Sequence, residues 1–511
     1  MNLAMILDMV ADGMADRVLV GDRETGLTGT DLRARALAGA GHLASRGARR
    51  LLYLGPNGPA FPVALFAAAY AGVPFLPVNY RLGAEQLADV MGRQESPLVV
   101  TDTPERVPGA ETVGIGEFMA LTAGDDPAST SSASPVSSAA SVAAALDPEA
   151  VAVLLMTSGT TAAPKSAVLR HSNLTSYLFG SVEFGSVPDT DATLVSVPPY
   201  HIAAVANALS NLYSGRRIVY MDRFAPGDWL GTVERQRITH AMVVPTMLAR
   251  IVAELRERGT PGPGCLKSVS YGGAKIAPEI IESALKLFPG TGFVNAYGLT
   301  ETASSIAVLG PDDHREAADS ADPSVRARLG SVGRALPSVE IEVQDDQGRA
   351  CAPYIVGDIV VRGPQVSGEY LEAGSKVRGD GWFPTRDRGY LDDAGYLFVR
   401  GRADDTIIRG GENIAPAEIE DALDGHPAVL ECVVAGVPDV EWGQRIGAFV
   451  IARPGAEVDA DELRSWVRER LRGSKTPEHV VFVDEFPTTP TGKVLRRELV
   501  ALVHGDDSVP A

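Results

Sequence analysis

A run of hydroxyl, glycine and lysine residues at positions 157–166 carries the clearest chemical signal in this chain. It reads Thr-Ser-Gly-Thr-Thr-Ala-Ala-Pro-Lys-Ser and follows an apolar run at 151–156 that is typical of a buried strand. Backbone N–H groups and hydroxyls on such a turn suit the oxygens of a polyphosphate, and Lys165 adds a mobile cation. The run is not a Walker loop, because Pro164 stands where that motif has glycine. It predicts a phosphate-binding turn, with an ordinary polar loop and a solvated lysine as the alternative.

Further motifs follow in order along the chain. They are Tyr-Gly-Leu-Thr-Glu at 297–301, Thr-Arg-Asp at 385–387, Gly-Arg-Ala-Asp-Asp at 401–405 running into Gly-Gly-Glu-Asn at 410–413, and Pro-Thr-Gly-Lys at 490–493. With the 157–166 run, they closely resemble the adenylate-forming superfamily of acyl-CoA ligases, peptide-synthetase adenylation domains and luciferases. The resemblance covers nearly the whole chain, and in motif style it is closest to aryl- and acyl-CoA ligases.

This resemblance implies that ATP activates a carboxylic acid. A carboxylate oxygen attacks the α-phosphorus and pyrophosphate leaves, so two anions meet and the site must supply positive charge and hydrogen-bond donors. The 157–166 loop is then expected to hold the β- and γ-phosphates. The loop residues expected to contact the nucleotide are Thr157, Ser158, Gly159, Thr160, Thr161 and Lys165.

The 297–301 motif implies the metal and adenine sites. Thr300 would offer a hydroxyl to the α-phosphate and Glu301 a carboxylate to Mg²⁺, which typically takes one or two protein carboxylates besides phosphate oxygens. Asp387 matches the acid that binds the ribose hydroxyls, and Arg402 matches a contact to ribose or phosphate. The residues expected around adenine are Gly272, Gly273, Ala274, Asn295, Ala296, Tyr297 and Gly298.

The C-terminal motifs imply a second set of contacts. Lys493 matches the lysine that reaches the carboxylate and α-phosphate during adenylation, and Asp404 matches the hinge about which the C-terminal domain rotates. Gly410 and Gly411 would leave room for the pantetheine arm of CoA. Trp442 resembles a tryptophan that contacts CoA in aryl-CoA ligases, although an indole is equally often a core residue.

His201 matches the histidine beside the acyl pocket. Amino-acid-activating relatives usually place an aspartate near this point, whereas this chain continues with the apolar residues 202–206, which cannot pair with an ammonium group. The sequence therefore favours a carboxylic acid without an α-amine, with an aryl or medium acyl group.

The chain departs from the family pattern at three positions. Ala162, Ser166 and Arg386 stand where the family usually has glycine. A Cβ at a position that needs positive φ costs about 1 kcal/mol, so these changes are expected to stiffen the loops and slow phosphate binding or loop closure. Because Lys165 and Glu301 are retained, an active enzyme is still expected.

Composition limits the class of protein. At 511 residues the chain exceeds a single core, and its net charge of −19 argues against binding of nucleic acid or anionic membranes. The three cysteines are too far apart to suggest disulfides or a metal site, and they fit a reducing cytoplasm. Residues 1–20 carry three aspartates and no basic start, which indicates an amphipathic helix rather than a signal peptide, and no apolar run is long enough to span a bilayer.

Alternating strand-like and helix-like segments predict an α/β fold with parallel sheets covered by helices. The expected strands are 51–54, 98–101, 151–156, 193–197, 217–221, 241–244 and 267–271, and the expected helices include 61–71, 202–213 and 278–287. Residues 330–400 read as a β-rich subdomain. The C-terminal part predicts a small α+β domain with helices at 417–423 and 461–471 and strands at 431–434, 448–451 and 480–483.

The expected division is an N-terminal adenylation core over residues 1–402 and a mobile C-terminal lid over 403–511. A Ser/Ala-rich tract at 128–145 reads as a surface insertion.

The predicted function is a carboxylate–CoA ligase that uses ATP, Mg²⁺ and CoA. One alternative keeps adenylation but transfers the acyl group to a carrier-protein phosphopantetheine or to an amine. Another is a diazotase that activates nitrite for attack by an aryl amine, and a third is a nucleotide-binding regulator without turnover. Length and composition do not give the oligomeric state.

Overall fold

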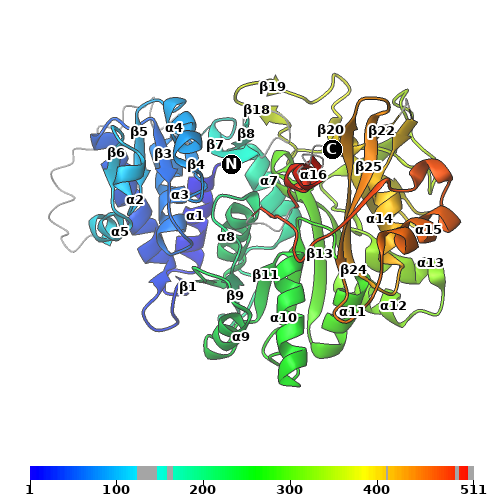
Figure 1. Ribbon diagram of the computed structural model, residues 1–511. Helices are drawn as coiled ribbons and strands as arrows, with labels where there is room; N and C mark the ends of the chain where they lie inside the picture. Colours follow the sequence, from blue (N-terminus) through cyan, green and yellow to red (C-terminus); the bar gives the residue numbers. More distant parts are fainter. Residues whose placement is uncertain (124–146, 158–164, 410–411, 490–493, 505–511) are drawn as a thin grey trace. The chain divides into compact units, whose positions relative to one another are not determined.

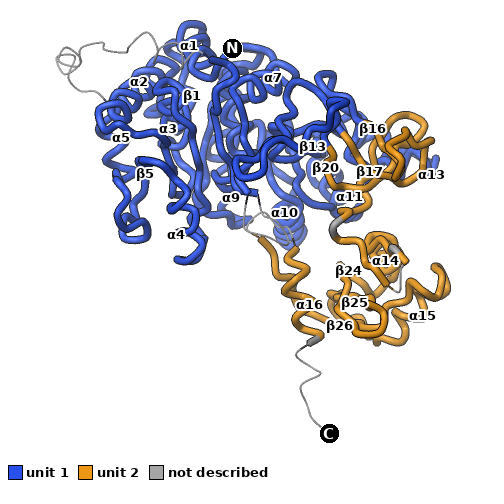
Figure 2. The backbone as a smooth tube through the Cα atoms, turned by 90° about the horizontal axis from the view of Figure 1, so that it is seen from above, with its two compact units in different colours: residues 1–341, 361–383 blue, residues 342–360, 384–511 orange. Residues whose placement is uncertain are grey.

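The computed structural model describes residues 1–123, 147–157, 165–409, 412–489 and 494–504 (Figure 1). The chain divides into two compact units, which Figure 2 shows in different colours. Unit 1 comprises Met1–Ile341 and Val361–Phe383, and unit 2 comprises Glu342–Val360 and Pro384–Ala511. The boundary expected after residue 402 falls inside unit 2 in this division, and it stays a prediction.

The described part of unit 1 contains a nine-stranded sheet in the order β15-β14-β13-β12-β11-β9-β10-β1-β2. Its central strands run parallel, and β13–β14, β14–β15 and β1–β2 pair antiparallel. The strands are β1 (Val18–Val20), β2 (Leu27–Thr28), β9 (Ala192–Val195), β10 (Arg217–Tyr220), β11 (His240–Val243), β12 (Ser268–Gly272), β13 (Gly292–Leu299), β14 (Ser304–Leu309) and β15 (Arg334–Ala335).

A second sheet of unit 1 has eight described strands in the order β19-β18-β8-β7-β4-β3-β5-β6. Strands β3 to β7 pair in parallel, and β8, β18 and β19 extend the sheet with antiparallel pairs. The strands are β3 (Arg50–Tyr53), β4 (Phe75–Pro77), β5 (Pro97–Val100), β6 (Glu111–Val113), β7 (Val151–Thr157), β8 (Lys165–Arg170), β18 (Glu369–Tyr370) and β19 (Gly374–Ser375).

Helices join and cover these strands (Figure 1). Helix α3 is apolar on every side, so residues 60–69 are buried, and it packs against α1, α2 and α5. The helices in the described part of unit 1 are α1 (Leu3–Gly13), α2 (Gly29–Ser45), α3 (Ala60–Ala71), α4 (Ala84–Gly92), α5 (Ile115–Ala123), α7 (His171–Ser181), α8 (Ile202–Ser214), α9 (Pro226–Arg235), α10 (Pro245–Arg258), α11 (Pro278–Leu287), α12 (Pro311–Asp319) and α13 (Pro323–Arg326).

Proline and glycine set several helix ends. Helices α10 and α11 begin with Pro245 and Pro278, where the missing N–H is not needed for a helical hydrogen bond. Helices α8 and α10 end before Gly215 and Gly259, whose φ values of 85° and 63° are left-handed. These local signals fix the helix lengths.

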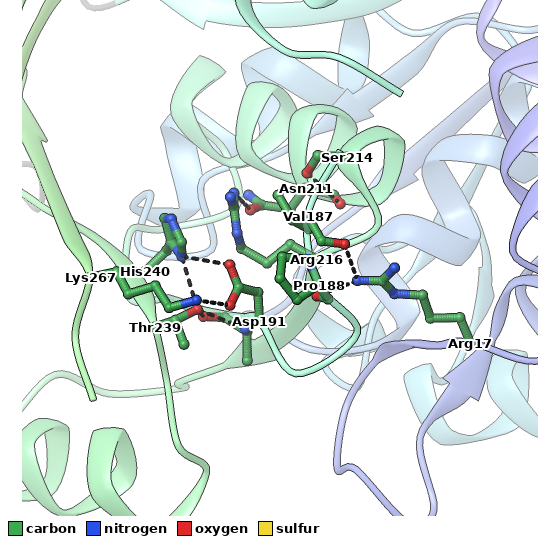
Figure 3. A network of polar contacts seen from close by, with 11 residues as sticks. Arg17, Val187, Pro188, Asp191, Asn211, Ser214, Arg216, Thr239, His240 and Lys267 are labelled. Carbon is green, nitrogen blue, oxygen red and sulfur yellow. Dashed lines mark hydrogen bonds and ion pairs between the residues drawn. The ribbon is translucent and has the colours of Figure 1, made fainter. Parts of the chain in front are cut away.

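A polar network ties together the amino ends of three parallel strands of the nine-stranded sheet (Figure 3). The buried carboxylate of Asp191, before β9, accepts a hydrogen bond from Nζ of Lys267, before β12, at 2.6 Å. Thr239 Oγ1, before β11, exchanges hydrogen bonds with Ala192 N and O at 3.0 and 3.1 Å and lies 2.9 Å from Nδ1 of His240. The network therefore joins the residues that precede β9, β11 and β12, and it lies at the amino ends of these parallel strands, opposite to their carboxyl ends.

Unit 2 contains the remaining strands. A four-stranded sheet in the order β16-β17-β20-β21 lies mostly within it, beside a two-stranded ribbon β22-β23 and a three-stranded sheet β24-β25-β26. The strands are β16 (Glu340–Gln344), β17 (Gly357–Arg362), β20 (Phe383–Leu391), β21 (Leu397–Arg402), β22 (Ile407–Arg409), β23 (Glu412–Ile414), β24 (Val429–Asp439), β25 (Gly443–Ala452) and β26 (His479–Phe482). The helices are α14 (Pro416–Asp424), α15 (Ala460–Arg470) and α16 (Arg496–His504).

The predicted fold class is confirmed, since helix-covered parallel sheets form the large N-terminal part. The helix predicted at 278–287 agrees with α11 at both ends. The first helix was predicted too long, because α1 ends at Gly13 and Val18–Val20 pairs in parallel with β10. Among the described residues, no helix combines the length and apolar character needed to cross a membrane.

Candidate active site

The predicted phosphate turn is closed at its base by a strand pair. Thr157 ends β7, Lys165 begins β8, and the two residues face each other in the antiparallel register. The hydroxyl of Thr157 also donates a hydrogen bond to the carbonyl oxygen of Lys165 at 3.2 Å. The turn itself, with Ser158, Gly159, Thr160, Thr161 and Ala162, lies outside the described residues. The structure thus places both ends of the predicted loop side by side.

Ser166 does not have the backbone strain that was expected for a residue in place of glycine. It lies in strand β8, and it is absent from the positions with positive φ among the described residues. Its N–H and its hydroxyl donate to the two carboxylate oxygens of Glu372, at 2.8 and 2.9 Å. The expected backbone strain is therefore wrong for this position, because the strand holds the residue extended.

Thr300 and Glu301 lie in a short 3-10 turn, Thr300–Thr302, directly after β13. Two residues with positive φ follow it, Ala303 at 54° and Ser304 at 115°. The fully buried amide of Gln365 donates to the carbonyl oxygens of Thr302 and Ser305 at 3.0 and 2.9 Å. The unusual backbone after the turn is therefore held by a side chain that is distant in sequence.

Tyr370 contacts two charged residues of the predicted site, Glu301 and Lys165. Its hydroxyl donates to Oε1 of Glu301 at 2.5 Å, and Nζ of Lys165 lies 5.7 Å from the centre of its ring. The structure thereby brings Lys165 and Glu301 to the same tyrosine. Their roles towards phosphate and metal remain predictions.

The glycines predicted beside adenine have a packing reason of their own. A Cβ on Gly272 would lie 2.1 Å from the carbonyl oxygen of Ala296, and one on Gly298 would lie 1.9 Å from that of Ser304. Gly273 has a φ of 88°, which favours glycine. Close strand packing therefore requires two of these glycines whether or not a ring binds there.

Asn295 and Tyr297 both lie on β13. The amide of Asn295 donates to the carbonyl oxygen of Ser331 at 3.1 Å, and Tyr297 is half-buried against a cluster that includes Ile306. Strand β13 thus brings the adenine-side residues and the 300–302 turn into one continuous segment.

His201 precedes helix α8, and its ring lies against that of Tyr200 at 4.6 Å between centroids. Burial lowers the pKa of His201 to about 4, so the imidazole is neutral at physiological pH. Its Nε2 is buried and has no hydrogen-bond partner among the described residues, and the same holds for the hydroxyls of Tyr200 and Ser196. Buried polar atoms without partners are expected where a ligand completes the hydrogen bonds.

The residues after His201 divide between two roles. Ile202 and Ala203 are half-buried and pack against the hydrophobic core of unit 1, whereas Ala204 and Val205 lie inside that core. The expected apolar lining can therefore come from the first two residues of this run and not from the whole of it.

Within unit 2, Asp387 and Arg402 face each other across strands β20 and β21. Nε of Arg402 lies 3.6 Å from Oδ1 of Asp387, whose side chain is only 9% exposed. Arg386 has a φ of 64°, so the strain expected from replacing glycine is present at this position. The predicted ribose acid thus stands beside a cation and follows a strained residue.

The CoA-side prediction also falls in unit 2. Trp442 is 39% exposed, and the guanidinium of Arg409 lies 4.6 Å from the centre of its ring. Because of this exposure, the indole is a surface group and not a core residue. Arg409 in turn donates a hydrogen bond to Glu478 at 2.5 Å. Asp404 lies in the 3-10 turn Ala403–Asp405 between β21 and β22. Gly410, Gly411 and Lys493 lie outside the described residues.

Sequence reasoning did not identify the residues that support the site. Tyr370 and Gln365 lie about 65 residues from Glu301 in the sequence, and Glu372 lies about 200 residues from Lys165. A hydroxyl, a carboxylate or an amide in a loop carries no local pattern, so only the folded chain reveals these contacts.

Two protein-family models match this chain. The family model described as AMP-binding enzyme matches residues 7–371, and the model described as AMP-binding enzyme C-terminal domain matches residues 418–493. The first match covers the motifs at 157–166 and 297–301, and the second ends at Lys493, whereas the motifs between 385 and 413 lie between the two matches.

Two curated relatives span almost the whole chain. A feruloyl-CoA synthase from Amycolatopsis sp. is 35% identical over 482 residues, which is 93% of this chain and 94% of that protein. The fatty acid–[acyl-carrier-protein] ligase ScoC from Streptomyces coeruleorubidus is 32% identical over 479 residues, covering 90% and 88%. The acids and acceptors in these names belong to those proteins.

The fold agrees with a solved structure. The o-succinylbenzoate CoA synthetase from Bacillus subtilis, in complex with its acyl-adenylate intermediate, has a TM-score of 0.80 and 28% identity, with 97% of each chain covered. The same enzyme has also been solved with ATP and a magnesium ion, at a TM-score of 0.79. Since the family model matches well over half of the sequence and the fold agrees, this chain belongs to the AMP-binding enzyme family, the adenylate-forming superfamily.

Proposed function

We propose that this protein is an ATP- and Mg²⁺-dependent carboxylate–CoA ligase that works through an acyl-adenylate. In the first half-reaction, a carboxylate oxygen attacks the α-phosphorus of ATP and pyrophosphate leaves. In the second, the CoA thiol loses its proton and attacks the acyl carbonyl, and AMP leaves. Membership of the AMP-binding enzyme family and the CoA ligases among its relatives support this function.

The arrangement of Lys165 and Glu301 around Tyr370 carries the proposal. A cation at the base of the phosphate turn can bind the β- and γ-phosphates, and a carboxylate next to it can hold the magnesium ion. Bound Mg²⁺ would neutralise negative charge on the phosphates of ATP. We assign Thr300, in the same turn as Glu301, to the α-phosphate.

Asp387 and Arg402 are assigned to the ribose, and the Gly272 to Ala274 and Asn295 to Gly298 segments to adenine. These assignments rest on the motif positions, together with the pairing of Asp387 with Arg402 in unit 2.

The acid is proposed to be an aryl or medium acyl acid without an α-amine. His201 is neutral and has an unpaired Nε2, so it can donate or accept one hydrogen bond but cannot serve as a charged partner. The half-buried Ile202 and Ala203 offer apolar surface after it. A feruloyl-CoA synthase as a relative supports an aryl group.

CoA is the proposed acceptor, and a carrier protein is the second candidate. The relationship to an acyl-carrier-protein ligase favours that second candidate, whereas the net charge of −19 does not favour docking of an acidic carrier. The exposed Trp442, with the guanidinium of Arg409 over its ring, supports CoA, because an indole and a guanidinium suit a nucleotide.

ATP and CoA are cytoplasmic metabolites, so we also propose that the reaction takes place in the cytoplasm.

The experiment is thioester formation with ATP, Mg²⁺ and CoA over a panel of aryl and acyl acids, followed by mass spectrometry. We expect one class of acid to give a CoA thioester together with AMP and pyrophosphate. Lys165→Ala should lower kcat/KM for ATP about ten- to a hundredfold, because it removes one charge-assisted contact worth about 1.5–3 kcal/mol. Lys286→Ala, on the surface helix α11, is the matched control and should behave as the wild type. Acyl transfer to a phosphopantetheinyl carrier but not to CoA would replace the proposed acceptor.

A further inference from the structure

The segment 367–372 lies across both charged parts of the proposed site. The backbone N–H groups of Ser367 and Gly368 donate to the carbonyl oxygen of Glu301, at 2.9 and 3.1 Å. Further along the same segment, the N–H of Leu371 donates to the carbonyl oxygen of Ser166 at 2.9 Å. One short stretch of chain is therefore bonded to the metal-side turn and to the lysine-bearing strand.

Side chains fix the same segment on either side of Tyr370. Glu369 forms a bidentate pair with Arg170 of strand β8, with its closest contact at 2.8 Å. Glu372 accepts both hydrogen bonds from Ser166. Tyr370 itself pairs with Ala167 in the sheet, which sets the face of the sheet on which its side chain lies.

The Tyr370 side chain contacts two groups of opposite charge. Its hydroxyl binds Oε1 of Glu301, and its ring lies 5.7 Å from Nζ of Lys165, within the range of a cation–π contact. Within the described ranges, no ion pair joins Lys165 to Glu301, and no hydrogen bond reaches Oε2 of Glu301. A direct pair between the two would neutralise the groups that phosphate and metal need.

We propose that Tyr370 is a positioning residue for the magnesium–nucleotide site. It orients Glu301 by binding one carboxylate oxygen and leaving the other for the metal, and it keeps Lys165 on its ring face and apart from Glu301. This inference rests on the proposed function, because it takes Glu301 as a metal ligand and Lys165 as a phosphate ligand.

The test measures binding and not turnover. Mn²⁺ binding is followed by electron paramagnetic resonance in the presence of α,β-methylene-ATP, without acid or CoA. Tyr370→Phe keeps the ring and loses the hydroxyl, so Mn²⁺ affinity should fall about tenfold. In a separate assay of thioester formation, its KM for Mg²⁺ should rise while kcat recovers at saturating Mg²⁺. Tyr370→Leu also loses the ring, so it should additionally weaken binding of the nucleotide. Melting temperatures check that each variant folds.

Tyr354→Phe is the matched control, because the hydroxyl of Tyr354 donates to Asp393 at 2.9 Å on the exposed surface of unit 2. It should bind Mn²⁺ as the wild type does. In a Glu301→Gln background, Tyr370→Phe should add almost nothing, since the tyrosine acts through that carboxylate.

Unchanged Mn²⁺ affinity in Tyr370→Phe, with normal binding by the wild type, overturns this inference alone. A full additional loss in the Glu301→Gln background also overturns it, because the hydroxyl would then act elsewhere. Absence of Mn²⁺–nucleotide binding by the wild type overturns the proposed function, and the inference with it.

Discussion

Glu372 accepts one hydrogen bond from the N–H and one from the hydroxyl of Ser166, through its two separate carboxylate oxygens. Ser166 stands where the family pattern led us to expect glycine, and the residue lies in an extended strand. The serine therefore adds a contact to a carboxylate without adding backbone strain. Strand β8, which begins at Lys165, is tied to a loop from a distant part of the sequence by this pair.

Ser166→Gly should accordingly destabilise the protein, because there is no backbone strain at this position for glycine to relieve. The loss of one hydrogen bond to a charged group on the surface is expected to cost about 1 kcal/mol and to raise the KM for ATP about two- to fivefold. Thermal denaturation and steady-state kinetics measure the two effects. In a Glu372→Ala background, the same change should cost only the small difference in backbone entropy. A gain of stability on introducing glycine would mean that the strand is strained after all.

Arg386→Gly should have the opposite effect. Arg386 has a φ of 64°, a conformation that costs a residue with a Cβ about 1 kcal/mol, and glycine adopts it freely. The denaturation midpoint should therefore rise. Arg386→Ala keeps the Cβ and removes the rest of the side chain, so it separates strain from lost contacts. If alanine stabilises as much as glycine does, the side chain and not the backbone is the source of the effect.

Acid should destabilise the protein through its buried histidines. Burial lowers the pKa of His171 from 6.5 to about 4, and its Nδ1 accepts a hydrogen bond from the N–H of Leu3 at 3.2 Å. Because the unfolded chain binds a proton more readily than the folded one, stability is complete above pH 6.5 and is lost as the pH falls towards 4. The contribution of this single group is up to about 3 kcal/mol.

His171→Asn retains an acceptor but cannot take up a proton, so its stability should depend less steeply on pH than that of the wild type. Urea denaturation at pH 7 and pH 5 measures this. His240, whose pKa is also lowered to about 4 by burial, should keep part of the dependence in the variant. Equal slopes for variant and wild type would exclude His171 as a source of acid sensitivity.

Lys493→Ala should separate the two half-reactions. The lysine is proposed to serve adenylation only, so the variant should fail to form the acyl-adenylate while it largely keeps CoA transfer from a presynthesised adenylate. Asp404→Pro, in the turn between β21 and β22, should do the reverse by restricting the backbone at the proposed hinge. Equal loss of both half-reactions in Lys493→Ala would contradict the assignment, and so would normal thioester turnover in Asp404→Pro.

The elements of the fold that follow from local patterns could be predicted from the sequence. Helix α11 has proline at its start and an apolar stripe, and strand β7 is a continuous apolar run, so both were found within one residue. Hairpin β24–β25 extends well beyond the predicted strands. Gly436 and Pro438, near its turn, interrupt the alternation of apolar and polar residues, so the sequence did not show that the strand pairing continues through them.

The candidate site was predictable only where motifs carry it. Lys165, Glu301 and Asp387 were predicted from their motifs, and the structure places the first two around one tyrosine. That tyrosine was missed, because its contact with Glu301 depends on a strand pair between Tyr370 and Ala167 that leaves no pattern in either stretch of sequence. The glycine at 272 shows the converse, since strand packing explains a residue that the motif assigned to adenine.

The central claim is that this protein adenylates a carboxylic acid, and ATP–pyrophosphate exchange without CoA tests it most directly. The assay takes a panel of aryl, short and medium-chain acids and includes nitrite. We expect exchange with one class of carboxylic acid, dependent on Mg²⁺ and lost in Glu301→Gln. Exchange with nitrite alone would make the protein a diazotase, and bound ATP without exchange for any acid would contradict the claim.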